Sequence, residues 1–345
     1  MKALSIHLTD VCNSKCTFCI VDAPYMKQDT IMRRRVSRFL AEHAGQGYEA
    51  VSLHGGEATV RPDFLEILDE IAERGYPTVF LMTNGRKFAR MNYAQTVVGK
   101  GVSEFIISLH GATAATQDGI SLARGSFDQA IQGIKNVKAL GATVRTNSVV
   151  CKDNYTELPA IIDLCLDLGA DQVSISALHT SGTALRNFDK VTPRYEVIRP
   201  YVVEATDRAV RRGTRPYLEG FPYCAVPPEY EEYLVDWEEH KYKVLYRSFV
   251  MDDYGDHMDD FARVKDERCD SCFFNDVCGG VYKEYAEFIG WDEFKPVLTR
   301  GDDPPEPPEG RDALGAAFPP RSGASLCRSS VQAAPRPDGP VVTVQ

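Results

Sequence analysis

The sequence lacks any uninterrupted apolar run of about 18 residues, the length that a membrane-spanning helix requires. Its first residues, MKALSIHLTD, have neither the basic segment nor the apolar segment of a secretory signal peptide. Basic residues are also scarce, with 39 Lys and Arg against 49 Asp and Glu and a formal charge of -10. These absences predict a cytoplasmic protein with no membrane partner, and they argue against nucleic acid as a partner.

A framework of disulfide bonds is not expected in this protein, because the cytoplasm keeps thiols reduced. The chain nevertheless has 10 cysteines, and most fall in groups whose spacing is typical of metal binding or catalysis. The grouped cysteines are Cys12, Cys16 and Cys19 at the start, Cys269, Cys272 and Cys278 near the end, and Cys224 between them. Cys151, Cys165 and Cys327 stand apart, and we expect them to be inert.

Segments rich in β-forming residues alternate with amphipathic segments along the first half of the chain. The expected strands are residues 3–8, 49–54, 78–83, 104–110, 143–150 and 171–179. Helices are expected over residues 62–73, after a capping box at Ser126, and after Thr156. Repeated βα units with right-handed crossovers build a parallel sheet that curls into a full or partial barrel. In such barrels the chemistry lies at the C-terminal ends of the strands.

Polar and glycine-rich motifs follow the first four expected strands, so that we expect them to meet at one edge of the sheet. They are CNSKCTFC (residues 12–19), HGGE (54–57), TNG (83–85) and SLHG (108–111). Three thiolates at C-x3-C-x2-C spacing can hold three irons of a 4Fe-4S cluster and leave the fourth iron open to a substrate. A structural zinc site, with His7 as a further ligand, is the alternative.

These motifs, in this order, resemble those of the radical S-adenosylmethionine (SAM) superfamily over about residues 3–180. The resemblance implies an enzyme with an α/β fold, a partial (β/α)6 barrel, that cleaves SAM to a 5'-deoxyadenosyl radical. It would need a flavodoxin- or ferredoxin-type electron donor. The implied site consists of a 4Fe-4S cluster on Cys12, Cys16 and Cys19, with the methionine ammonium of SAM at Gly55, Gly56 and Glu57, the ribose at Ser108 and Asn147, and the adenine at Ile175 and Leu178. Ile175 could equally be barrel core.

The later cysteines resemble the twitch module, the shortened form of the SPASM domain. The resemblance implies one auxiliary 4Fe-4S cluster on Cys224, Cys269, Cys272 and Cys278, which we call the auxiliary cysteines; a zinc site with four thiolates is the alternative. The expected domains are a barrel at residues 1–212, an auxiliary-cluster region at 213–298 and a disordered proline-rich tail at 299–345.

The substrate class is open among several interpretations. The main one is a small molecule of natural-product (antibiotic) biosynthesis: a sugar, aminocyclitol or nucleoside sugar that is decarboxylated (as cytosylglucuronate is), epimerised or dehydrogenated. A peptide-modifying maturase is the alternative, although a first cluster cysteine at residue 12 leaves no room for an N-terminal peptide-binding domain. A molybdenum-cofactor-type cyclase is disfavoured by the lack of a C-terminal Gly-Gly and by the spacing of the late cysteines. A non-enzymatic iron-sulfur module is disfavoured because the Gly-Gly-Glu motif has no use without the SAM cofactor. Candidate substrate contacts are Arg145, His54, His110, His179 and Glu219, with Arg145 suited to a carboxylate.

Overall fold

The computed structural model describes residues 2–22, 29–235, 241–247 and 249–299. The predicted disordered tail lies outside the described residues from residue 300 onward. No helix among the described residues is long and apolar enough to cross a membrane.

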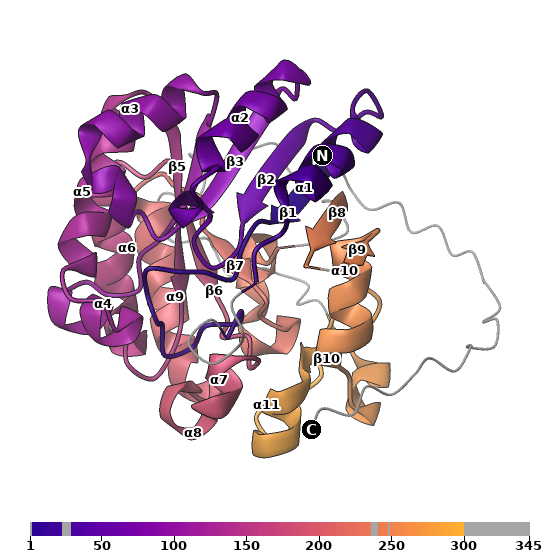
Figure 1. The fold of residues 1–345 in the computed structure, drawn as a ribbon. Helices are drawn as coiled ribbons and strands as arrows, with labels where there is room; N and C mark the ends of the chain where they lie inside the picture. The colour runs from indigo at the N-terminus through magenta and orange to yellow at the C-terminus, as the bar shows by residue number, and fades with distance from the viewer. Residues whose placement is uncertain (1, 23–28, 236–240, 248, 300–345) are drawn as a thin grey trace.

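A mostly parallel sheet forms the centre of the molecule, and its strands lie in chain order from β1 to β7 (Figure 1). All six expected strands are present, and the predicted partial barrel is confirmed. A short seventh strand, which the sequence analysis missed, follows β6. The strands are β1 (Lys2–His7), β2 (Ala50–His54), β3 (Thr78–Thr83), β4 (Glu104–Ser108), β5 (Thr143–Val149), β6 (Gln172–Ser176) and β7 (Tyr217–Glu219).

The other edge of the sheet is extended by a part of the chain that is distant in sequence. Strand β8 (Lys241–Tyr246) runs parallel to β1, and β9 (Phe249–Met251) pairs antiparallel with β8. The first strand therefore lies between β2 and β8, and both neighbours hold the chain that leads into the CNSKCTFC motif.

Helices cover the outer face of the sheet, and the main hydrophobic core fills the space between the two layers. Along β5, buried residues such as Val144 alternate with half-buried ones such as Arg145 and Asn147, as expected for a strand with one apolar face. The helices are α1 (Arg33–His43), α2 (Phe64–Glu73), α3 (Met91–Gly99), α4 (Ala114–Ser121), α5 (Ser126–Ala139), α6 (Leu158–Asp167), α7 (Thr183–Arg186), α8 (Phe188–Val191) and α9 (Tyr195–Arg211).

Two expected helix caps are wrong. Ser126 is the first residue of α5 and not its cap; its hydroxyl donates to Asp118 at 2.8 Å. Thr156 lies in a 3-10 turn (Tyr155–Glu157) that precedes α6, and no side chain caps that helix. In both places tertiary contacts and a tighter turn replace the local cap.

The C-terminal part of the described chain extends from the β8 edge of the sheet to α8 and α9, where Phe288 contacts Phe188 and the Tyr285 hydroxyl accepts from the Tyr195 amide at 3.1 Å (Figure 1). It contains α10 (Tyr254–His257), a π-helical turn (Met258–Ala262), the antiparallel pair β10 (Arg263–Val264) and β11 (Val281–Tyr282), and α11 (Lys283–Ile289). The three late cysteines lie on the connection between β10 and β11.

Candidate functional site

The cluster loop, residues 12–19, begins where the first two strands continue their parallel pairing. The Gly56 amide donates to the carbonyl of Thr9 at 2.7 Å, and the Glu57 amide donates to the carbonyl of Val11 at 2.9 Å. This pairing places Cys12 beside the HGGE motif.

The two glycines of that motif are required by this close approach. A Cβ atom on Gly55 would lie 2.4 Å from the Thr9 carbonyl oxygen, and Gly55 has a φ of +146°. A Cβ atom on Gly56 would lie 2.5 Å from the Asp10 carbonyl oxygen. Only glycine therefore lets the two backbones meet here, whatever else the motif binds.

The three thiols of the cluster loop are half-buried and lie near one another. Burial, with a smaller contribution from the neighbouring thiols, raises the pKa of Cys12 to about 11 and that of Cys16 to about 12. Elsewhere on the loop, the Cys19 carbonyl accepts a hydrogen bond from the Thr183 amide at 2.8 Å. Three adjacent thiols at a strand end fit an iron-sulfur cluster by their chemistry, because thiolates are the usual ligands of such clusters. Among the described residues, no three Cys, His, Asp or Glu side chains lie at the spacing of a single metal ion.

Glu57, which is expected to contact the methionine ammonium, is surrounded by hydrogen-bond donors of the protein. Its carboxylate is 1% exposed and accepts hydrogen bonds from the hydroxyl and amide of Thr59, the hydroxyl of Thr83 and the amide of Asn84. The Thr83 and Asn84 contacts are 2.8 to 2.9 Å long. The carboxylate therefore ties the loop after β2 to the loop after β3.

Two residues after β3 hold the cluster loop from the other side, and sequence reasoning missed both roles. The Asn84 amide nitrogen donates to Asn13 Oδ1 at 2.6 Å and lies 3.8 Å from the Cys12 sulfur. Arg86 donates to the carbonyl of Asn13 and to the hydroxyl of Ser14. The TNG motif marked this strand end, but no sequence signal shows that Arg86, one residue later, reaches the loop.

The residues expected to bind the nucleoside of SAM separate into two groups. Ser108 and Asn147 are neighbours in register on β4 and β5, and Asn147 Oδ1 accepts from the Ser176 hydroxyl at 2.7 Å. Ile175 is fully buried in the main hydrophobic core, and Leu178 packs in a smaller core with Phe18. The placement of Ile175 therefore favours the barrel-core interpretation.

His110 is buried where the SLHG turn meets the cluster loop. Its Nδ1 accepts from the Val149 amide at 3.2 Å, its ring meets that of Phe18 edge-on at 5.1 Å, and burial lowers its pKa to about 4. The ring is neutral and packs the SLHG turn against the cluster loop. The expected contact of His110 with a substrate stays a prediction.

The other two candidate histidines, His54 and His179, also pack against ring side chains. The His54 ring lies 5.5 Å from that of His7, and burial lowers the pKa of His54 to about 3. His179 stacks on Tyr282 at 4.5 Å, and burial lowers its pKa to about 4.

Arg145 and Glu219 lie on the same face of the sheet as Asn147. Arg145 Nη2 lies 3.5 Å from Glu104, its guanidinium lies over the Tyr217 ring, and its buried Nε has no hydrogen-bond partner among the described residues. Glu219 accepts from the Ser176 hydroxyl at 3.2 Å. Burial raises the pKa of Glu219, and the charge of Arg145 opposes this rise. We call Glu104, Arg145 and Glu219 the charged inner face.

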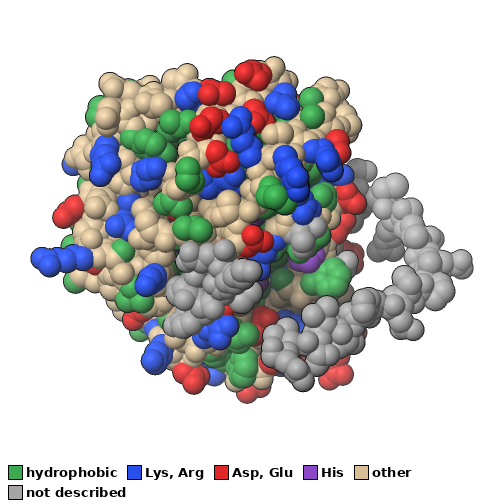
Figure 2. All heavy atoms as spheres, viewed as in Figure 1, with side chains coloured by type: hydrophobic (Ala, Val, Ile, Leu, Met, Phe, Trp, Pro, Cys, Tyr) green, Lys and Arg blue, Asp and Glu red, His purple; other side chains and the backbone are tan. Residues whose placement is uncertain are grey.

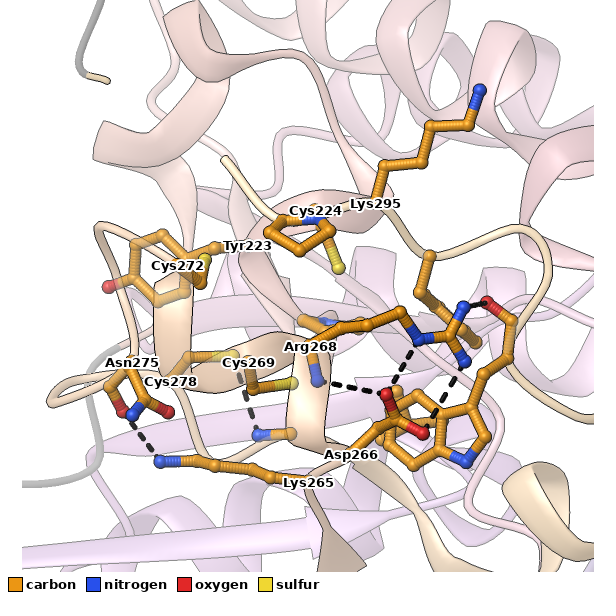
Figure 3. Close-up of a pocket in the computed structure, with 16 residues that line it drawn as sticks. Tyr223, Cys224, Lys265, Asp266, Arg268, Cys269, Cys272, Asn275, Cys278 and Lys295 are labelled. Carbon is orange, nitrogen blue, oxygen red and sulfur yellow. Dashed lines mark hydrogen bonds and ion pairs between the residues drawn. The ribbon is translucent and has the colours of Figure 1, made fainter. Parts of the chain in front are cut away.

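The structure brings the four auxiliary cysteines around one pocket, although Cys224 is 45 residues away from Cys269 in sequence (Figure 3). Cys224 lies in a turn whose carbonyls at Cys224 and Ala225 accept hydrogen bonds from Arg199 of α9. Burial, with smaller contributions from the other three thiols, raises the pKa of Cys224 to about 12. Thiols are the usual ligands of iron-sulfur clusters and of structural zinc, although no three of these thiols lie at the spacing of a single metal ion in the described part of the chain.

The leftover cysteines within the described residues are structural. Cys151 and Cys165 are completely buried, the first in the smaller core with Phe18 and the second in the main core. Each behaves as a small apolar side chain. Cys327 lies outside the described residues.

Curated relatives are named for one activity. The chain is 28% identical to a probable GTP 3',8-cyclase of Sulfurisphaera tokodaii over 233 residues, which are 66% of this chain and 73% of that relative. It is 32% identical to a probable GTP 3',8-cyclase of Saccharolobus solfataricus over 189 residues, 53% of this chain and 58% of that relative. The chain thus spans little more than half the length of the second relative.

Solved structures share the fold. Streptococcus suis SuiB bound to S-adenosylmethionine superposes with a TM-score of 0.60 at 18% identity, covering 85% of this chain and 76% of SuiB. SuiB bound to the precursor peptide SuiA gives a TM-score of 0.60 at 17% identity, covering 87% and 75%. At this identity the similarity shows the fold alone.

The family model described as the Radical SAM superfamily matches residues 6–165, which contain the cluster loop and the HGGE motif. Residues 6–165 are therefore similar to the Radical SAM superfamily domain, and they lie in a partial barrel whose fold solved structures share.

Proposed function

We propose that the protein is a radical SAM enzyme, that it acts on a sugar-containing small molecule, a nucleoside or nucleotide sugar above all, and that it carries one auxiliary iron-sulfur cluster. Cys12, Cys16 and Cys19 would hold the first cluster, and the auxiliary cysteines the second. When bound, the first cluster and SAM would supply a 5'-deoxyadenosyl radical that removes a hydrogen atom from the substrate.

The charged inner face is the observation that carries the substrate class. Buried charges are costly unless polar groups face them, and here Arg145 and Glu219 lie on the side of the sheet away from the hydrophobic core. Burial raises the pKa of Tyr242 on β8, and the charges of Arg145 and Glu219 also act on this pKa. Strand β8 therefore lies near these two residues. Such an interior suits a polar molecule with hydroxyl or carboxylate groups better than an apolar one.

Within this interior each residue would have a separate task. The unpartnered Nε of Arg145 would bind a substrate carboxylate or phosphate, with the guanidinium fixed by Glu104 and Tyr217. Glu219 would accept or donate hydrogen bonds to a hydroxyl, and Asn147 with Ser176 would orient the ribose of SAM. His110 would keep the cluster loop in place without touching the substrate.

The similarity to proteins named GTP 3',8-cyclase favours a nucleoside within this class over a free sugar. It also makes a nucleotide cyclase the second candidate function. The spacing of the late cysteines argues against a cyclase. The two candidate functions are therefore distinguished by which substrate the enzyme converts.

Isotope transfer tests the proposal. The reconstituted enzyme is incubated with SAM, dithionite and either cytosylglucuronate or GTP, each deuterated on the sugar ring, and 5'-deoxyadenosine is analysed by mass spectrometry. We expect deuterium from a sugar carbon, and Arg145→Lys should slow turnover of the carboxylate substrate because it loses the bidentate contact. Deuterium from GTP together with a cyclised product would establish the second candidate.

Transfer only from a peptide carbon, with no turnover of any sugar or nucleoside offered, would replace the proposal with a peptide maturase. The reductant consumed per product reports the outcome for the substrate. Decarboxylation and epimerisation return an electron or a hydrogen atom to the substrate, whereas dehydrogenation would pass an electron outward to the cluster at the auxiliary cysteines.

A further inference from the structure

Helix α1 begins with a charge pattern that opposes its own stability. Arg33, Arg34 and Arg35 fill its first turn, Arg38 follows one turn later, and no acidic residue lies in that first turn. The amino-terminal end of a helix carries partial positive charge, so that cations there are unfavourable. No side chain caps this end either. Cations that destabilise the start of a helix, with no compensating contact nearby, are typical of a functional surface.

Most of these cations are available to a partner. Arg33 is paired with Glu70 of α2 at 2.6 Å, but within the described part of the chain the side chains of Arg34, Arg35 and Arg38 form no ion pair or hydrogen bond. Arg34 and Arg38 are exposed, and Arg35 is half-buried. Lys and Arg side chains gather over the region of α1 in Figure 2. This surface is opposite in sign to the chain as a whole, whose formal charge is -10.

The start of α1 is attached to the chain that leads into the cluster loop. Thr30 pairs with Thr9, and the Ile31 amide donates to the Leu8 carbonyl at 3.2 Å. Leu8 and Thr9 lie between β1 and Cys12. Because α1 starts at the C-terminal edge of the sheet, its first turn lies on the same edge as the cluster loop.

We propose that Arg34, Arg35 and Arg38 are the docking surface for an acidic, one-electron carrier protein of the flavodoxin or ferredoxin class. The proposal rests on the proposed function, in which the cluster on Cys12, Cys16 and Cys19 must be reduced. The carrier would lose one electron and the cluster would gain it, with no bond made or broken between the two proteins. Complementary charge would speed their encounter and orient the carrier toward this edge.

The test compares two reductants on one pair of matched variants. Arg34→Gln/Arg38→Gln removes two exposed positive charges from the surface. Lys135→Gln/Arg211→Gln removes two exposed charges from the C-terminal parts of α5 and α9, at the opposite edge of the sheet. The rate of 5'-deoxyadenosine formation is measured with dithionite and with reduced flavodoxin, at low and at physiological salt.

We expect the first variant to lose about tenfold in rate with flavodoxin at low salt, and to lose most of the salt dependence, as for an electrostatically steered encounter. Its rate with dithionite should equal that of the unmodified enzyme, and the control variant should be unchanged with both reductants. Its Tm should be equal or higher, because the removed charges oppose the helix dipole.

An equal flavodoxin rate in all three proteins, with dithionite activity intact, would overturn the docking surface and leave the proposed function standing. If the unmodified enzyme formed no 5'-deoxyadenosine with dithionite, the proposed function would instead be refuted. A lower Tm in the first variant than in the control would make the arginines structural. Loss of RNA oligonucleotide binding in that variant, without an effect on the flavodoxin rate, would assign the surface to a nucleic acid.

Discussion

Replacement of Glu57 by Gln tests what the carboxylate of the HGGE motif does. In the structure this side chain is an acceptor for Thr59, Thr83 and Asn84, and none of these donors belongs to a ligand. Gln has the same shape, but it has only one acceptor atom and presents an NH2 group to a donor that previously met an oxygen. The loops after β2 and β3 should therefore separate even when no SAM is present.

The size of the effect follows from the buried hydrogen bonds. Oε2 accepts from the Thr83 hydroxyl at 2.9 Å and from the Asn84 amide at 2.8 Å. An amide nitrogen in its place leaves at least the buried Asn84 donor unsatisfied, which costs about 1 to 3 kcal/mol, and more where the lost acceptor was charged. For a chain of this size that corresponds to a decrease in Tm of roughly 1 to 5 °C.

Thermal unfolding of the apoprotein measures this directly, and iron content after anaerobic reconstitution reports whether the cluster loop still closes. Thr59→Val is a matched control, because it removes one donor and keeps the charge; it should lower the Tm less than Glu57→Gln. A Glu57→Gln apoprotein with an unchanged Tm, together with weaker SAM binding, would refute this reasoning and assign the carboxylate to the methionine ammonium.

Three further predictions follow from other parts of the site. Gly56→Ala should abolish iron binding to the cluster loop, because its Cβ would lie 2.5 Å from a carbonyl oxygen; normal iron content would mean that the loop is not held against the glycines. Since burial lowers the pKa of His110 to about 4, the unfolded chain takes up a proton below about pH 6.5 that the folded chain refuses. As the pH decreases from about 6.5 to 4, the free energy of unfolding should therefore decrease by up to 1.4 kcal/mol per pH unit for this group. Urea unfolding of His110→Asn should show a smaller decrease over the same pH range. An identical pH dependence in the two proteins would contradict the neutral ring. Replacement of all four auxiliary cysteines by Ala should remove about four of about eight irons, whereas stoichiometric zinc in the intact protein would refute the auxiliary iron-sulfur cluster.

The sequence was sufficient for the barrel because each of its first six strands is a segment rich in β-forming apolar residues. Strand β7 has three residues, too few to show any period. Strand β8 was missed for another reason. Its partner is β1, more than 230 residues earlier in the chain, and nothing local marks such a pairing.

The site was predictable where the ligand type is fixed by chemistry and unpredictable where it depends on neighbours. The cysteine spacing indicated two sets of thiols, and the structure gathers each set. By contrast, the sequence could not show that Glu57 is surrounded by donors or that Arg86 reaches Asn13. The place of Ile175 was available from the sequence, since it alternates with Ser174 and Ser176 and so faces the opposite side of β6.

The central claim is that the thiols of the cluster loop carry the reductive cleavage of SAM, and one measurement tests it most directly. The intact protein and the Cys12→Ala/Cys16→Ala/Cys19→Ala variant are reconstituted anaerobically and incubated with SAM and dithionite, and 5'-deoxyadenosine and methionine are quantified. We predict that the intact protein forms both in equal amounts, and that the variant forms neither while it keeps the iron bound by the auxiliary cysteines. Equal 5'-deoxyadenosine formation by the two proteins, or none by an intact protein that holds its full complement of iron, would contradict the account.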